Sequence, residues 1–384
     1  MAGVNMQSMA RSLLIYRLTG SAALLGIATV TNFLPLIFLS PIGGALADRL
    51  KKKHVVLAGQ VLSVVMALVV AVPLSLGYLT PHNQSSWWVL ILAYLLDGIC
   101  IGLTGPAYGA MVREIVDAEH VMNAIALNGL GQNGLRILAP ILTGVIISAF
   151  DFAAVFYIVA VLFLVGNFFL VFIPATPPQA SAAGPRHPIA DIREGFAYVR
   201  RAPVLMAVLV FLFVVVLLSM PYGVLLPVFS DDILKVGATG MGVLISVSGV
   251  GATLMSLVMA SLPNRKRGLL LLAGTMLLGL TLIGFSFSTV WAISLAVIFL
   301  VGLGDAVRMT LGNTLLLYYS DQAHWGRVIS VQTMVWGLSS VGALLAGLVG
   351  QALGVQWAIG GFAIALVLVV LATAAFVPVL RRLD

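Results

Sequence analysis

Charged residues are scarce in this chain, and that shortage excludes most classes of soluble protein. Of the 384 residues only 9% are charged, whereas 61% are hydrophobic. A soluble domain carries about 25% charged residues. A surface this apolar is stable in a bilayer rather than in water, and the composition therefore predicts an integral membrane protein.

Cysteine is almost absent, and histidine is dispersed. The one cysteine, Cys100, lies inside an apolar run, which excludes a disulfide framework and a cysteine metal site. The five histidines lie far apart along the chain and show no metal-ligand spacing and no nucleophile triad. The membrane-buried charges are Asp and Arg only, without the acid, base or metal cluster that a membrane enzyme needs. We therefore predict no enzymatic activity, no cofactor and no metal.

Long apolar runs fill the rest of the sequence. A membrane-spanning helix needs about 20 apolar residues. Eleven runs meet that length, at 21–46, 55–79, 87–112, 122–149, 152–174, 203–229, 238–262, 268–287, 289–318, 325–352 and 355–379. A shorter stretch from Val4 to Leu18 precedes them and contains Arg11. We interpret it as the second half of a first helix, from a misassigned start or a fragment, so that twelve helices are expected, eleven of them complete.

The basic residues fix the expected orientation. The net charge is +7, but the lysines and arginines cluster in short loops between apolar runs, which argues against nucleic acid as a partner. One set of loops contains fifteen of them, whereas the opposite set contains only Arg17 and Lys235. The positive-inside rule places the fifteen, and the C-terminus, in the cytoplasm. The sequence thus predicts a multi-pass protein of the cell membrane.

A segment rich in Pro, Ala and Ser, residues 174–188, divides the chain. It predicts an N-terminal bundle (1–174), a cytoplasmic linker (175–202) and a C-terminal bundle (203–384). Within the linker, Ile189, Ile192, Phe196 and Val199 recur at helical spacing, which predicts an amphipathic helix on the membrane surface. The alternative is the entry turn of the next span.

The two bundles echo each other in sequence. Trp87 and Trp291 each open a span, at an offset of 204 residues, and Ala124–Asn128 matches Val328–Gln332 at the same offset. An internal duplication of six helices, with a substrate site between the halves, is a common plan of secondary transporters. The repeat therefore favours a transporter.

A short loop carries the sharpest motif. Residues 43–53 read Gly-Gly-Ala-Leu-Ala-Asp-Arg-Leu-Lys-Lys-Lys, with Gly44, Asp48, Arg49, Lys52 and Lys53 at the positions of interest. The segment resembles the signature loop of the major facilitator superfamily, except that Lys51 replaces the usual Gly. That resemblance implies an all-α fold of two six-helix bundles and a conformational role for the loop.

A narrower resemblance covers nearly the whole chain. Gly105–Ala107, Val121–Asn128 and Arg136–Pro140 with Gly144 are similar to the branch that contains the enterobactin exporter and the macrolide efflux proteins. It implies proton-driven export, by antiport, of a small amphipathic molecule of drug or siderophore type. It also implies a hinge in the fifth span at Gly134, Pro140 and Gly144, for which close helix packing is the alternative.

Charges inside spans are candidates for function because each costs about 3 kcal/mol at the bilayer centre. Asp97 and Arg136 lie on consecutive spans and are predicted to pair, as a proton or substrate relay or as a static lock. Asp305 and Arg308 lie three residues apart on one helix face and are predicted to pair directly, with the lock favoured.

The expected partners are protons, a small-molecule substrate and lipid, for a protein that acts as a monomer. A membrane sensor or assembly partner with the same fold, which transports nothing, is the alternative function.

Overall fold

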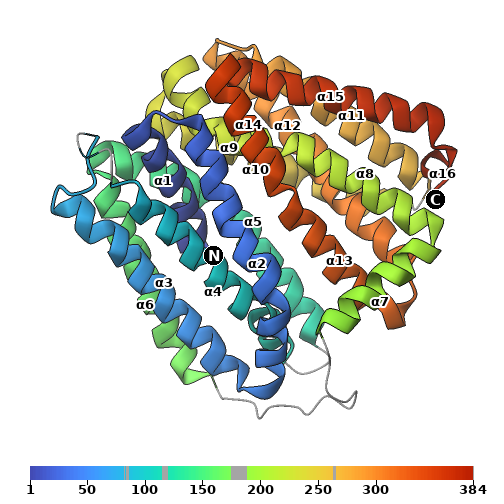
Figure 1. The fold of residues 1–384 in the computed structure, drawn as a ribbon, viewed down its shortest axis with the longest axis horizontal. Coiled ribbons are helices and arrows are strands. Elements are labelled where there is room, and N and C mark those ends of the chain that lie inside the picture. Colours follow the sequence, from blue (N-terminus) through green and yellow to red (C-terminus); the bar gives the residue numbers. More distant parts are fainter. Residues whose placement is uncertain (82, 84–85, 115–119, 174–187, 263–264, 384) are drawn as a thin grey trace. The chain divides into compact units, whose positions relative to one another are not determined.

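The computed structural model describes residues 1–384 except 82, 84–85, 115–119, 174–187, 263–264 and 384. All regular structure in the described part is helical. The chain forms two compact units, each described below by itself (Figure 1). Unit 1 comprises Met1–Leu24, Ala28–Ile189 and Gly237–Gly242, and unit 2 comprises Leu25–Ile27, Ala190–Val236 and Val243–Asp384.

The described residues contain eleven helices or helix pairs that are long and apolar enough to cross a membrane. They lie at 22–44, 52–75, 88–109, 127–149, 152–172, 203–233, 237–261, 267–286, 291–318, 325–353 and 355–376. Each coincides with one of the eleven expected spans, and the predicted all-α membrane fold is confirmed.

The first helix is longer than the apolar stretch that predicted it. Helix α1 runs from Ala2 to Thr19, so its 18 residues extend over about 27 Å. It ends at Gly20, whose φ of 62° gives the left-handed conformation that closes a helix without steric strain. Ser21 then accepts a hydrogen bond from the Leu24 N–H and begins the next helix.

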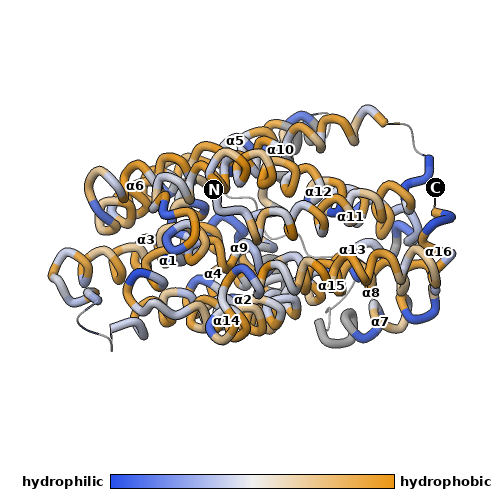
Figure 2. Tube along the Cα trace, turned by 90° about the horizontal axis from the view of Figure 1, so that it is seen from above, coloured by the Kyte–Doolittle hydropathy of each residue, from blue (hydrophilic) through white to orange (hydrophobic). Residues whose placement is uncertain are grey.

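Unit 1 contains five further helices. They are α2 (Ala22–Arg49), α3 (Lys52–Ser75), α4 (Trp88–Glu114), α5 (Val121–Ala149) and α6 (Phe152–Phe172). Helix α3 packs against α4 and α6, and α1 packs against α5 and α6 (Figure 1). Figure 2 shows that hydrophobic residues dominate the helices while the polar stretches concentrate towards helix ends and loops. Several large side chains of α6 stay exposed, Phe168, Phe169 and Phe172 among them, as a lipid-facing helix requires.

Unit 2 contains the remaining helices, except the stretch Gly237–Gly242 at the start of α10, and two of its spans are interrupted. They are α7 (Pro188–Arg201), α8 (Pro203–Ser219), α9 (Pro221–Val228), α10 (Gly237–Ser261), α11 (Arg267–Ser286), α12 (Trp291–Tyr318), α13 (Trp325–Leu338), α14 (Ser340–Leu353), α15 (Val355–Phe376) and α16 (Pro378–Arg381), with a π-helical turn at Phe229–Ile233 and a 3-10 turn at Gln322–His324. Pro221 lacks an N–H donor and stands at the break between α8 and α9. Helices α8, α11, α12 and α15 surround a large apolar cluster.

The linker helix α7 is a separate helix, because Ala202 adopts an extended conformation between it and α8. Of the residues that predicted it, Val199 is buried and Phe196 is exposed, whereas the side chains of Ile189 and Ile192 lie outside the described residues. The buried side of α7 packs on α13, where a Cβ on Gly195 would lie 3.2 Å from the Arg327 carbonyl oxygen. Its position at a membrane surface and the domain bounds at 174 and 203 stay predictions.

Candidate functional site

Among the described residues of unit 1, Arg11 is the most buried charge, and it forms an ion pair with Asp97. The Arg11 Nη2 donates to the Asp97 Oδ2 over 2.7 Å. The same oxygen accepts a hydrogen bond from the Asn32 Nδ2 at 3.3 Å. Three helices, α1, α2 and α4, thus contribute one side chain each. The Arg11 side chain is 3% exposed and that of Asp97 is 18% exposed, so the carboxylate is the accessible member.

Arg11 is held by more than its ion pair. Its Nη1 donates to the Ala93 carbonyl oxygen at 3.1 Å, and its guanidinium stacks over the Tyr94 ring at 4.7 Å. Its Nε has no hydrogen-bond partner, and neither has the Nε2 of Gln7, one helical turn earlier. Loss of one member of a buried ion pair costs about 3–5 kcal/mol, because the other charge stays behind without compensation.

A glycine next to Asp97 lets the helices approach. A Cβ on Gly98 would clash with the carbonyl oxygen of Asn32. Only glycine therefore permits α4 to cross α2 at this depth, and the crossing brings the Asn32 amide to the carboxylate, with a second bond to the Tyr94 carbonyl oxygen at 3.0 Å. The site is built on rigid helix contacts rather than on a loop.

The predicted pair of Asp97 and Arg136 is wrong. Asp97 pairs with Arg11 instead, and the Arg136 side chain is exposed on α5. The physical reason is packing, because Asp97 lies on the side of α4 that meets α1 and α2 rather than α5. Arg136 is therefore absent from the site of unit 1.

The predicted pairing within α12 is confirmed. The Asp305 Oδ1 accepts from the Arg308 Nη2 at 2.6 Å and from its Nε at 3.0 Å. The Arg308 side chain is 8% exposed and that of Asp305 is 17% exposed. The Arg308 guanidinium also lies 5.9 Å from the centre of the Trp336 ring of α13. Unit 2 thus has a charged pair of its own.

Both carboxylates share one chemical feature. In each, one oxygen accepts both hydrogen bonds from its donors. Among the residues that the structure describes, none donates a hydrogen bond to the Asp97 Oδ1 or to the Asp305 Oδ2. One oxygen of each partly exposed carboxylate is therefore open to a proton.

The signature loop connects α2 and α3. A Cβ on Gly43 would clash with the Gly102 carbonyl oxygen, so close packing is required there, whereas Gly44 has open space around it. Arg49 is exposed, Lys52 is half-buried, and the Asp48 side chain lies outside the described residues. The Lys53 Nζ donates to the carbonyl oxygens of Val171 and Ile173, at 2.7 and 2.6 Å. Lys53 therefore caps the C-terminal end of α6, where a cation is favoured.

The expected hinge lies in α5, where its residues differ in packing. Gly134 has open space, and Pro140 lies inside the helix. A Cβ on Gly144 would lie 2.5 Å from the Ala238 carbonyl oxygen, in the stretch Gly237–Gly242 that belongs to unit 1. Close packing accounts for Gly144, and the hinge stays a prediction.

An apolar pocket of about 650 Å³ lies in unit 2, lined by Leu218, Val349, Leu353, Trp357, Gly361, Phe362 and Ala365. It offers no charged side chain that could bind a proton or orient a polar substrate. Within the described part of the chain, no three His, Cys, Asp or Glu side chains gather to hold a metal ion.

Two members of the unit 1 site, Asn32 and Tyr94, were absent from the sequence-based candidates. Arg11 was a buried charge without an assigned partner. An amide inside an apolar span is a signal for interhelical hydrogen bonding, and Asn32 carries that signal.

Comparison with known proteins supplies the family. Residues 1–383 match the MFS family described as a transmembrane secretion effector. An uncharacterised MFS-type transporter of Bacillus subtilis (strain 168) is 28% identical over 294 residues, which cover 72% of this chain and 64% of the relative. The enterobactin exporter of Escherichia coli O1:K1 / APEC is 27% identical over 311 residues, which cover 80% of this chain and 72% of the exporter.

Solved structures share the fold at low identity. A POT family transporter in complex with 5-aminolevulinic acid superposes with a TM-score of 0.77 at 13% identity, covering 99% of this chain and 94% of the transporter. A nucleoside transporter superposes with a TM-score of 0.72 at 15% identity, covering 98% of this chain and 99% of the transporter. The eleven spans agree with these structures on the fold of a multi-pass membrane protein.

Proposed function

This chain belongs to the transmembrane secretion effector family of major facilitator transporters, and on that premise we propose that it is a proton-coupled exporter. The substrate is a small amphipathic molecule of drug or siderophore type, exchanged for protons by alternating access. One relative is an enterobactin exporter, which supports a siderophore-type substrate.

The observation that carries the coupling is the Arg11–Asp97 pair. Asp97 has an oxygen open to a proton, while its other oxygen is held by Arg11 and Asn32. A proton on Asp97 removes the charge that holds the guanidinium, so the link between α1 and α4 weakens. Because α1 also packs on α5 and α6, a movement of α1 that follows the weakened link would be passed on to these two helices. Asp97 is the proton acceptor in this scheme, and Arg11 is the switch that senses it.

The pair in unit 2 has a different role. Asp305 and Arg308 belong to one helix, so protonation of Asp305 would free Arg308 without separating two helices. The 204-residue offset places Asp97 opposite Val301, one helical turn before Asp305. The two carboxylates thus lie on the same face of equivalent helices. The pairing within one helix supports a local lock that orients Arg308 beside Trp336.

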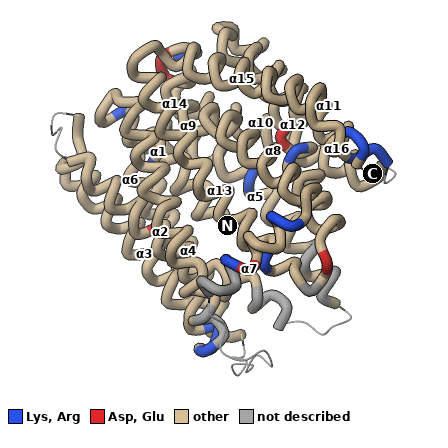
Figure 3. The backbone as a smooth tube through the Cα atoms, turned by 45° about the vertical axis from the view of Figure 1, so that its right-hand side comes forward, with Lys and Arg blue, Asp and Glu red and all other residues tan. Residues whose placement is uncertain are grey.

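The membrane setting follows the charge distribution. We infer that the protein lies in the plasma membrane as a monomer, with the C-terminus and the α2–α3 loop in the cytoplasm. Figure 3 shows that most described Lys and Arg residues lie near helix ends.

Transport by the purified full chain in proteoliposomes tests the proposal. With an imposed pH gradient, we expect net movement of ethidium or iron-free enterobactin that stops when the gradient is collapsed. Movement of the probe at the same rate with and without the pH gradient would contradict proton coupling. Binding of both probes without movement of either would identify a sensor that uses the same fold.

A further inference from the structure

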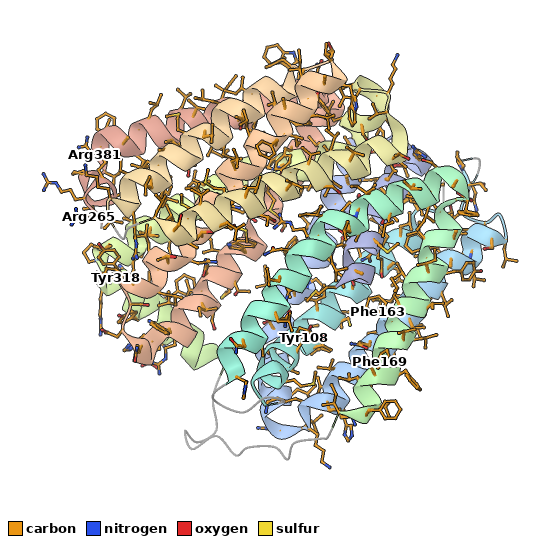
Figure 4. The ribbon with its side chains drawn as sticks, turned by 180° about the vertical axis from the view of Figure 1, so that it is seen from behind. Tyr108, Phe163, Phe169, Arg265, Tyr318 and Arg381 are labelled. Carbon is orange, nitrogen blue, oxygen red and sulfur yellow. The ribbon has the colours of Figure 1, made fainter. Side chains whose placement is uncertain are left out.

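Two basic segments of unit 2, far apart in the sequence, meet at one corner. The loop before α11 supplies Arg265, the first residue of α11 is Arg267, and the C-terminal segment supplies Arg381 and Arg382. The Gly268 N–H donates to the Leu383 carbonyl oxygen at 3.1 Å, which ties the two segments together. We name these four arginines the basic corner. Figure 4 shows Arg265 and Arg381 side by side at one corner of the structure.

The tie between the segments is specific. A Cβ on Gly268 would clash with the Leu380 carbonyl oxygen, so only glycine lets the C-terminal segment lie this close to α11. Leu380 and Leu383 are buried, at 1% and 4% exposure, and anchor the segment. Arg381 and Arg382 lie between these two anchors and are exposed. Membrane orientation requires only that basic residues lie in the correct loops, and it does not require this convergence.

The charges of the basic corner are not neutralised by described residues. No acidic side chain in the described part of the chain forms an ion pair with Arg265, Arg267, Arg381 or Arg382. Three acids of unit 2 face other residues: Glu194 pairs with Arg327, Asp305 pairs with Arg308, and Asp321 accepts from the Tyr198 hydroxyl. Concentrated positive charge of this kind attracts an anion.

The surroundings of the basic corner are apolar. Leu269 and Val379, each two residues from an arginine, are 49% and 40% exposed, and Phe376 at the end of α15 is 83% exposed. The Arg267 guanidinium lies over the Tyr318 ring at 5.2 Å, and such aromatic rings favour the headgroup level of a membrane. The corner also lies at the start of the span 267–286 and just after the end of the span 355–376. Positive charge beside exposed apolar side chains matches a phospholipid better than a soluble anion.

We propose that the basic corner binds the headgroup of an anionic phospholipid, with the acyl chains along the exposed apolar side chains of α11, α15 and α16. The phosphate lies among the guanidinium groups, which donate hydrogen bonds to its oxygens. This site needs no transport activity and stands independently of the exporter function.

The test measures lipid binding to the purified full chain in detergent by native mass spectrometry. Dioleoyl phosphatidylglycerol should bind more tightly than dioleoyl phosphatidylcholine. The double variant Arg381→Gln/Arg382→Gln should weaken phosphatidylglycerol binding about 30-fold, from about fivefold for each basic residue at an anionic surface. The matched control Arg200→Gln/Arg201→Gln removes two exposed arginines of α7 and should leave binding unchanged.

Gly268→Ala tests the convergence without a change of charge, because it displaces the C-terminal segment, and it should also weaken binding. Three results would overturn the proposal: equal affinity for the two lipids, equal losses in both arginine double variants, or displacement of the lipid by free glycerol phosphate at equal concentration. The last result would identify a soluble anion as the ligand. If Gly268→Ala fails to fold, the two arginine double variants still decide the test, because they change exposed side chains only.

Discussion

The Arg11 Nη2 lies 2.7 Å from the Asp97 Oδ2, and this contact joins α1 to α4 across 86 positions of sequence. The arginine is almost fully buried, whereas the carboxylate is partly accessible. The pair therefore links two helices of unit 1, and in the proposed mechanism its carboxylate takes up the proton.

Removal of the buried cation should destabilise unit 1. Arg11→Gln leaves Asp97 without its charge partner and removes the bond to the Ala93 carbonyl oxygen. We expect a loss of about 2–4 kcal/mol in the free energy of unfolding in detergent. This loss is smaller than the roughly 3–5 kcal/mol of a fully buried ion pair, because Asp97 is partly solvated. Arg136→Gln makes the same chemical change at an exposed position of α5 and should alter stability by less than about 0.5 kcal/mol. Equal losses in the two variants would contradict the pairing.

Neutralisation of the carboxylate should abolish coupling. Asp97→Asn keeps the shape of the side chain but cannot take up a proton. In proteoliposomes we expect gradient-driven export of ethidium to fall to the level of empty liposomes. Asp305→Asn should retain measurable gradient dependence, because the pair in α12 links no two helices. A reversed order of the two effects would exchange the roles of the two carboxylates.

A side chain at the crossing of α2 and α4 should force these helices apart. Gly98→Ala places a Cβ against the Asn32 carbonyl oxygen and should cost about 1–3 kcal/mol of stability. Gly105→Ala, in the same helix, meets no atom within 4 Å and should be neutral or stabilising by up to about 1 kcal/mol. Thermal unfolding in detergent separates the two, and a neutral Gly98→Ala would contradict the described crossing.

Loss of the lysine cap should weaken the end of α6. Lys53→Gln shortens the side chain and removes the cation from the Val171 and Ile173 carbonyl oxygens. We expect a loss of about 1 kcal/mol, with faster hydrogen exchange confined to the last turn of α6. Lys51→Gln, at an exposed position of the same loop, is the control. Equal exchange in both variants would remove the capping role.

The sequence predicted the spans and the local pair but not the site of unit 1. Runs of apolar residues define membrane helices by length, so the span from Val355 to Phe376 was recognisable. Arg308 follows Asp305 by three residues, so helix geometry alone fixed their pairing.

The partner of Asp97 depends on which faces of α1 and α4 meet. Helices that are apolar on all sides carry no pattern that identifies those faces, so Arg136 was as acceptable a partner as Arg11. The close approach at Gly98 brings α2 and its Asn32 amide to the carboxylate, and it depends on an atom that glycine lacks.

The central claim is that the Arg11–Asp97 pair couples a proton to movement, and one double variant tests it most directly. Arg11→Gln/Asp97→Asn removes both charges together and should restore most of the stability lost in Arg11→Gln, because no uncompensated charge remains. Its export of ethidium under an imposed pH gradient is the decisive measurement. The account predicts a folded protein in which the gradient drives no export. Gradient-driven export at the wild-type rate would show that the pair is only a lock.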